Sequence, residues 1–151
     1  MNRVFTMVSM ILDKMRKVED TDLKVPKEWG LLKDVGLYNI NNIFRTHIHK
    51  SSSGHILFSD LLKQLSGFDV LGIKNLNYLF ANQSLIQEDC KGKETLFLGT
   101  IYVDEQNRLW TPKLYYLSFH EEWRNGWFCL SVDRISCHCS IVLISDNILN
   151  N

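Results

Sequence analysis

The sequence is poor in alanine and proline, with one alanine, Ala81, and two prolines, Pro26 and Pro112. It also lacks internal repeats, low-complexity tracts and long runs of one charge, which excludes repeat architectures and charged tails. Asparagine, isoleucine, leucine and lysine are plentiful instead. We have no physical account of this bias and interpret it as the mark of an AT-rich coding genome, either bacterial or from a phage.

Motifs that carry well-known chemistry are also missing. Neither common glycine-rich phosphate loop is present, so the sequence predicts no nucleotide cofactor. His120-Glu121-Glu122 lacks the second histidine of a helical zinc protease, and the paired cysteine spacings of a zinc ribbon are absent. We therefore expect no cofactor and no metal, and the sequence favours a role without catalysis.

The net charge is zero, from 17 basic and 17 acidic side chains. Proteins that bind nucleic acid through bulk electrostatics carry a basic excess, which this chain does not have. Low net charge weakens repulsion between copies, so self-association into a homo-oligomer is compatible with the composition. Because 45% of the residues are hydrophobic and 23% are charged, we expect a folded globular domain.

The N-terminal apolar run, Val4–Leu12, is interrupted by Thr6 and Ser9 and is followed at once by charged residues. It is shorter than the roughly 20 apolar residues that span a bilayer, and it lacks the cleavage site of a secretory signal. We therefore predict no membrane segment, a cytoplasmic location and reduced thiols. The four cysteines are Cys90, Cys129, Cys137 and Cys139.

The first 90 residues show helical spacing. A stripe of apolar residues every three or four positions predicts a helix over residues 2–20. Shorter helices are predicted over residues 39–50, over 59–66 with Ser59 as N-cap and Gly67 past its end, and over 73–81. Residues 21–39 are a connection too apolar to be a free linker, so no domain boundary is expected there.

From residue 95 onward the pattern indicates strands. Leu96–Val103, Leu109–Leu117 and Ser140–Ser145 are the strand candidates, and Pro112 is expected to mark an edge strand or a bulge. The prediction is a single α+β domain over residues 1–151, helical over about 1–90 and β-sheet over about 94–146. Its N-terminal helices would pack on a C-terminal antiparallel β-meander of four to five strands, with a small half-open barrel as a variant.

Aromatic residues concentrate in the predicted sheet: seven of the seventeen fall between Trp110 and Phe128. Asn125-Gly126 is the strongest turn signal in the chain and predicts a two-residue type I′ hairpin turn. That turn would place Trp123 opposite Phe128 and Arg124 opposite Trp127. One face of the hairpin would then be aromatic, and the other would carry an arginine over an indole.

Aromatic rings and arginine are enriched where proteins bind each other. We therefore expect a non-catalytic interaction or regulatory protein. It would bind another macromolecule through the aromatic hairpin, and the expected partner is a protein. The candidate binding residues are Trp127, Arg124, Tyr115, Tyr116 and Trp110.

Two alternatives stay open. Aromatic rings on a barrel-like sheet can stack the bases of single-stranded nucleic acid, with Arg108, Lys113 and Arg124 as the cations. Acidic neighbours oppose that use. The other alternative is a small zinc or thiol protein that uses the Cys137-His138-Cys139 cluster, which would need further ligands from elsewhere in the chain.

Overall fold

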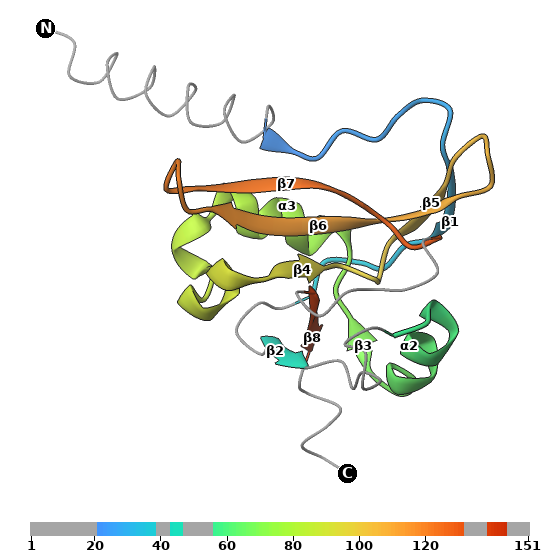
Figure 1. Cartoon of the computed structure of the whole chain (residues 1–151), viewed down its shortest axis with the longest axis horizontal. Helices are drawn as coiled ribbons and strands as arrows, with labels where there is room; N and C mark the ends of the chain where they lie inside the picture. The colour runs from blue at the N-terminus through green and yellow to red at the C-terminus, as the bar shows by residue number, and fades with distance from the viewer. Residues whose placement is uncertain (1–20, 39–42, 47–55, 132–138, 145–151) are drawn as a thin grey trace, which may run out of the picture.

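The computed structural model describes residues 21–38, 43–46, 56–131 and 139–144, and for 43–46 and 139–144 it describes the backbone alone. The predicted helix over residues 2–20 lies outside this part of the chain. The described residues form a mixed α+β fold in which helices cover an open sheet (Figure 1).

The sheet has the strand order β1-β5-β6-β4-β8-β2, and two further strands branch from it, β7 on β6 and β3 on β8. All pairs are antiparallel except β4 with β8, which is parallel. Three strands come from the part predicted to be helical. The strands are β1 (Gly30–Lys33), β2 (Ile43–Thr46), β3 (Asp69–Val70), β4 (Glu94–Leu96), β5 (Ile101–Val103), β6 (Leu109–Leu117), β7 (Glu122–Cys129) and β8 (Cys139–Ile144).

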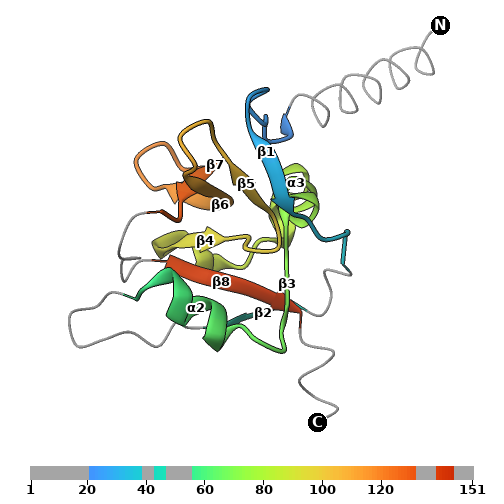
Figure 2. The same ribbon diagram turned by 90° about the vertical axis from the view of Figure 1, so that its right-hand side faces the viewer.

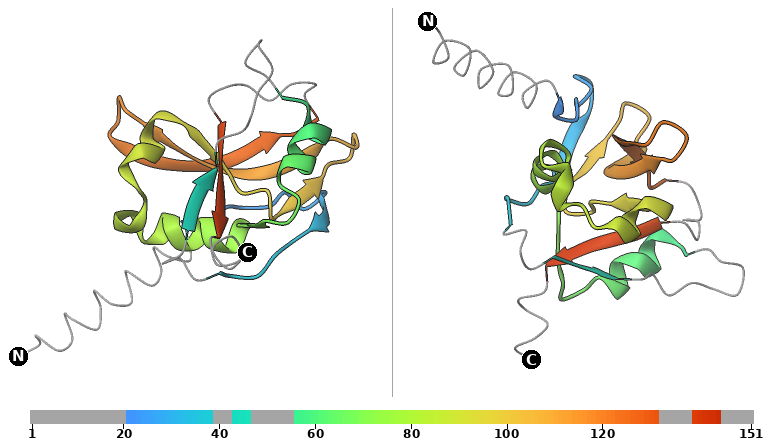
Figure 3. Two further views of the ribbon diagram at one scale, coloured as in Figure 1. Left: turned by 90° about the horizontal axis from the view of Figure 1, so that it is seen from below. Right: turned by 90° about the vertical axis from the view of Figure 1, so that its left-hand side faces the viewer.

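Two helices lie on opposite sides of β4 and β8 (Figures 2 and 3). Helix α2 (Phe58–Gln64) buries Leu61, and its C-cap residue Leu65 joins the same cluster with Leu96 and Leu98. Helix α3 (Ile73–Ala81) packs in a second cluster that contains Phe97. Two short 3-10 helices, η2 (Gln83–Leu85) and η3 (Glu88–Gly92), follow α3.

The predicted helices over 59–66 and 73–81 are confirmed as α2 and α3. Leu57, however, and not Ser59, is the N-cap of α2. Gly67 has a φ of +89°, a conformation that glycine adopts at low cost past the end of a helix.

The prediction of a helix over residues 39–50 is wrong for its described part. Residues Ile43–Thr46 form β2, which pairs with β8 residue by residue. Pairing with β8 decides the conformation of these four residues, because tertiary contacts override a weak local helical pattern.

The single strand predicted over Leu96–Val103 is divided into β4 and β5 by residues 97–100. Gly99 causes the break, because its N–H donates to the Leu71 carbonyl at 2.9 Å. A Cβ at Gly99 would lie 2.4 Å from the Val70 carbonyl oxygen, so only glycine permits this close approach of the two backbones. The Thr111 hydroxyl lies 2.9 Å from the Phe97 carbonyl oxygen and closes the same turn.

Strand β6 has neighbours on both sides, so the expectation that Pro112 marks an edge strand is wrong. Proline is tolerated because it lies where the partner of β6 changes from β5 to β4. Its carbonyl accepts from the Phe97 N–H at 2.9 Å on that side, and its missing donor faces the break between the two strands.

The hairpin turn predicted at Asn125-Gly126 is also wrong. Both residues lie inside β7, and the chain reverses at residues 118–121, where Glu121 has a φ of +51°. Strands β6 and β7 then pair over eight positions, from Leu117 with Glu122 to Trp110 with Cys129. That long ladder outweighs a local turn preference, which acts on only two residues.

Candidate functional site

Four aromatic rings meet on one face of the sheet at the end of the hairpin remote from its turn. Trp29, which precedes β1, stacks on Trp110 with 5.2 Å between ring centroids. It also meets the edge of Trp127 at 5.0 Å, and Tyr102 of β5 lies 5.5 Å from Trp127. We call these four residues the aromatic base. All four are half-buried.

The aromatic base holds the segment that precedes β1 against the hairpin, and Figure 1 shows this segment running along β7. The Trp127 indole N–H donates to the Lys24 carbonyl at 3.1 Å, and the Asn125 amide donates to the Thr21 carbonyl at 3.2 Å. The Leu23 N–H donates to the Asn77 side chain at 3.0 Å. The first part of the connection predicted over residues 21–39 thus packs down against side chains of β7 and α3. Residues 30–33 form β1 instead, and Leu31, Leu32 and Leu37 are exposed.

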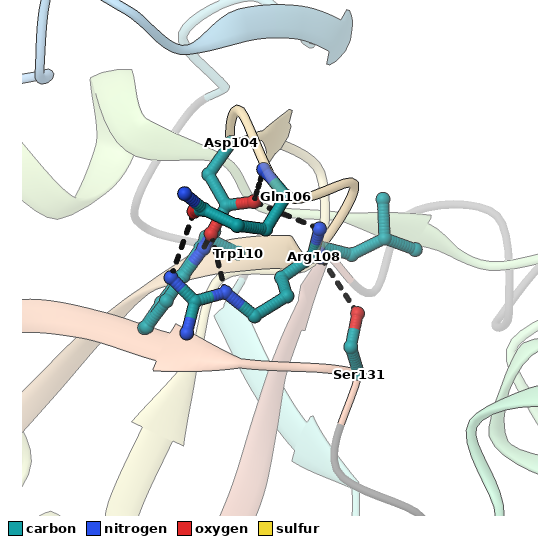
Figure 4. A network of polar contacts seen from close by, with 6 residues as sticks. Asp104, Gln106, Arg108, Trp110 and Ser131 are labelled. Carbon is teal, nitrogen blue, oxygen red and sulfur yellow. Dashed lines mark hydrogen bonds and ion pairs between the residues drawn. The ribbon is translucent and has the colours of Figure 1, made fainter.

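Asp104, in the loop between β5 and β6, supports the aromatic base (Figure 4). One carboxylate oxygen accepts from the backbone N–H groups of Gln106 and Arg108, both at 2.9 Å. The other accepts from the Trp110 indole at 2.9 Å and from Arg108 Nε at 2.7 Å. Burial raises the pKa of this carboxyl, but the hydrogen bonds lower it more, so the pKa falls from 3.8 to about 2.

The candidate residues divide between the two faces of the hairpin. Because Pro112 pairs with Trp127 and Tyr116 with Trp123, the side chains of Trp110, Tyr116 and Trp127 share the face of the aromatic base. Tyr115 pairs with Arg124, and both lie on the opposite face. The predicted contact of Arg124 with Trp127 is therefore wrong, because the Asn125-Gly126 turn on which it rested does not form.

The candidate tyrosines already have partners within the chain. Tyr116 meets the edge of Trp123 at 5.0 Å between centroids, and the Lys91 ammonium lies 4.5 Å from its ring. The Lys113 ammonium lies 4.9 Å from the Tyr115 ring. Cations at these distances are attracted to the ring face and cover it.

Phe119 is the residue that sequence reasoning missed. It lies in the turn at residues 118–121, at the tip of the hairpin, and its side chain is 96% exposed. Its nearest ring is that of His120, at 5.7 Å between centroids. The Asn125-Gly126 signal placed Phe119 away from a turn. The length of the apolar pattern in 109–117 was the available sign that the strand ends near Ser118.

The cations proposed for nucleic-acid binding are each paired with a carboxylate. Arg108 pairs with Asp104 at 2.7 Å, and Lys113 pairs with Glu94 at 2.8 Å. Arg124 pairs with Glu122 in the same strand. Paired cations add little net positive potential, so the hairpin is not a basic surface.

The predicted metal cluster lies largely outside the described residues, which include Cys139 but not Cys137 or His138. Cys90 is buried and Cys129 is half-buried. Within the described part of the chain, no group of three or more histidine, cysteine, aspartate or glutamate side chains is placed to hold a metal ion.

Comparisons with models of protein families, with curated protein sequences and with solved structures find no match for this chain. In the described part of the chain, no helix is both long enough and apolar enough to cross a bilayer.

Proposed function

We propose that the chain is a non-catalytic protein-binding module whose contact surface is the free end of the β6–β7 hairpin. Phe119 is the central anchor, and Tyr115 and Arg124 flank it on one face. Trp110 and Trp127 act from the other end, where they fix the hairpin to the segment that precedes β1.

The observation that carries the proposal is the 96% exposure of the Phe119 side chain. Most other aromatic rings of the hairpin touch a ring or a cation of the same chain, whereas Phe119 presents nearly its whole surface to solvent. Burial of a phenylalanine side chain contributes about 1.5–3 kcal/mol, which a partner with an apolar pocket would gain on binding. Aromatic anchors that fill such pockets dominate binding free energy at protein interfaces.

The flanking residues suit the edge of such an interface. Arg124 is exposed and pairs with Glu122, and Tyr115 is half-buried beneath the Lys113 ammonium. Rim contacts of this kind exclude water from the anchor and set orientation, while contributing less binding free energy themselves.

Single-stranded nucleic acid is a poorer fit to the same surface. Base stacking needs open ring faces next to unpaired cations. Here Tyr115 and Tyr116 lie under lysines, and Arg108, Lys113 and Arg124 pair with carboxylates.

The test begins with a photoreactive phenylalanine analogue placed at position 119 in living cells, with a matched analogue at Tyr78. Tyr78 lies in α3 and is 43% exposed, so it controls for nonspecific capture by an exposed ring. A protein captured only through position 119 is then purified and titrated by calorimetry.

We expect Phe119→Ala to weaken binding of that partner at least about tenfold, which corresponds to about 1.4 kcal/mol. Tyr78→Ala should bind as the unaltered chain does. Equal affinity of Phe119→Ala and the unaltered chain would show the proposal to be wrong, as would the absence of any adduct at position 119.

A further inference from the structure

Strand β1 is the last strand of the hydrogen-bonded path and has β5 as its strand neighbour among the described residues. All four of its residues are exposed, including Leu31 at 54% and Leu32 at 61%. An exposed apolar edge strand presents backbone N–H and C=O groups that a further strand can pair with.

A β-bulge limits how regular this edge is. Leu31 pairs with Tyr102 and Lys33 pairs with Ile101, so Leu32 is the extra residue that has no opposite partner on β5. The bulge turns Leu32 outward and shortens the regular stretch. A strand added here would therefore make few backbone hydrogen bonds and depend on its side chains as well.

The charges that flank β1 indicate what that strand is. Lys27 and Glu28 are exposed before the strand, Lys33 is its last residue, and Asp34 follows it. Asp34 already accepts from the Thr100 hydroxyl and lies 3.9 Å from the Lys74 ammonium. Among the described residues, no ion pair involves Glu28 or Lys33.

Two copies of β1 in antiparallel order bring the beginning of each strand to the end of the other. Glu28 of one copy then lies near Lys33 of the second, and two-fold symmetry repeats this contact. A parallel arrangement would place Lys33 beside Lys33 and Glu28 beside Glu28, which is repulsive.

We propose that β1 is a self-association edge, at which β1 of one copy pairs antiparallel with β1 of a second copy. In the register that pairs Glu28 with Lys33, Leu31 of each copy faces Gly30 of the other at the centre of this contact, and Leu32 faces Trp29. The two Glu28–Lys33 pairs form its ends. The zero net charge of the chain leaves no long-range repulsion to oppose the approach. The inference is independent of the proposed role of Phe119.

The association is weak, because four residues at a strand edge bury only part of the roughly 1,200–2,000 Å² of a standard interface. We therefore expect a monomer–dimer equilibrium in the micromolar to millimolar range, visible by sedimentation equilibrium of the full chain.

The decisive experiment exchanges the two charges. Glu28→Lys alone and Lys33→Glu alone each place like charges together twice, so each should raise the dimer dissociation constant at least about tenfold. The double variant restores opposite charges in antiparallel order and should return the dissociation constant to that of the unaltered chain. An equimolar mixture of the two single variants should form heterodimers.

Glu105→Lys is the control for net charge, because this substitution changes the charge of the chain by the same amount as Glu28→Lys. Glu105 is exposed in the loop between β5 and β6. Leu85→Lys is the control for Leu32→Lys, since Leu85 is 47% exposed in η2. We expect Leu32→Lys to abolish the dimer and both controls to leave it unchanged.

A chain that stays monomeric throughout this concentration range would overturn the proposal. So would a dimer whose dissociation constant is the same in Glu28→Lys, Lys33→Glu and Leu32→Lys. A parallel arrangement would give the unaltered chain, both single variants and the double variant similar dissociation constants, because each of them then opposes like charges, and only the mixture would bind more tightly; that pattern would overturn the antiparallel arrangement.

Discussion

The two ends of the β6–β7 hairpin contain the same kinds of side chain and use them differently. At one end, Trp110 and Trp127 touch Trp29 and Tyr102, and both indole N–H groups have acceptors within the chain. At the other end, Phe119 is 96% exposed. The difference arises from a third segment, because residues 21–33 cross the first end and leave the second bare.

The largest effect is expected at the aromatic base. Trp127→Ala removes two ring contacts and the hydrogen bond to the Lys24 carbonyl, so we expect it to lower the free energy of unfolding by about 2–3 kcal/mol. The measurement is equilibrium denaturation by urea. Trp127→Phe keeps a ring but loses the donor, and should lower the free energy of unfolding by about 1 kcal/mol.

If both ends of the hairpin were equally unconstrained, Trp127→Ala would change stability no more than a substitution at the tip. A double-mutant cycle with Trp29→Ala sharpens the comparison. We expect the two losses to be non-additive by at least about 0.5 kcal/mol, because the rings are in contact.

Acid should weaken the aromatic base through Asp104. Its pKa is about 2 in the folded chain and 3.8 without these interactions, so the unfolded chain binds a proton first as the pH falls. The stability that Asp104 contributes is complete above about pH 4 and is lost between about pH 4 and pH 2. Thermal unfolding across this range should show a smaller pH dependence in Asp104→Asn, and an identical dependence would contradict this prediction.

Gly126 lies between the two ends of the β6–β7 hairpin, and its substitution tests the register in which β6 and β7 pair. Inside β7, a Cβ at this position would meet Lys113 at 3.6 Å and Tyr115 at 3.7 Å, which are ordinary contacts. Glycine weakens a strand interior relative to alanine, so Gly126→Ala should raise the free energy of unfolding by about 0.5 kcal/mol. A turn at Asn125-Gly126 would require positive φ, and the same substitution would then be destabilising.

The smallest effect on stability is expected at the tip. Phe119→Ala removes a side chain that packs on little else, so the free energy of unfolding should change by no more than about 0.5 kcal/mol. Denaturation curves of this variant and of the unaltered chain should superimpose. A loss as large as that of Trp127→Ala would mean that Phe119 is buried in solution.

The sequence could predict elements that are specified by their own local pattern of residues, even where, as for β8, the strand partners are distant. Helix α3 begins at Ile73 and ends at Ala81, as predicted, because apolar residues at helical spacing follow Gly72. Strand β6 is likewise confirmed over Leu109–Leu117, and β8 is displaced from its predicted range by one residue.

Elements decided by distant partners could not be predicted. The Asn75 side chain is fully buried and forms two hydrogen bonds with the backbone of Tyr38, at 2.9 and 3.0 Å. This side chain thus satisfies the backbone N–H and C=O of Tyr38, as a neighbouring strand would. Nothing in the local pattern of residues 34–38 reveals that partner. For the same reason Trp127 was proposed as a contact residue, although its indole N–H is bound to a carbonyl that lies 103 positions earlier in the chain.

The pairing of β1 with β5 has a consequence for synthesis of the protein. Residues 101–103 leave the ribosome about seventy codons after residues 30–33, a delay of several seconds at roughly 5–20 residues per second. Throughout that interval the leucines of the nascent strand lack the neighbour that will order them. Chaperones that bind short apolar segments could therefore bind the β1 segment before β5 has been synthesised and can pair with it.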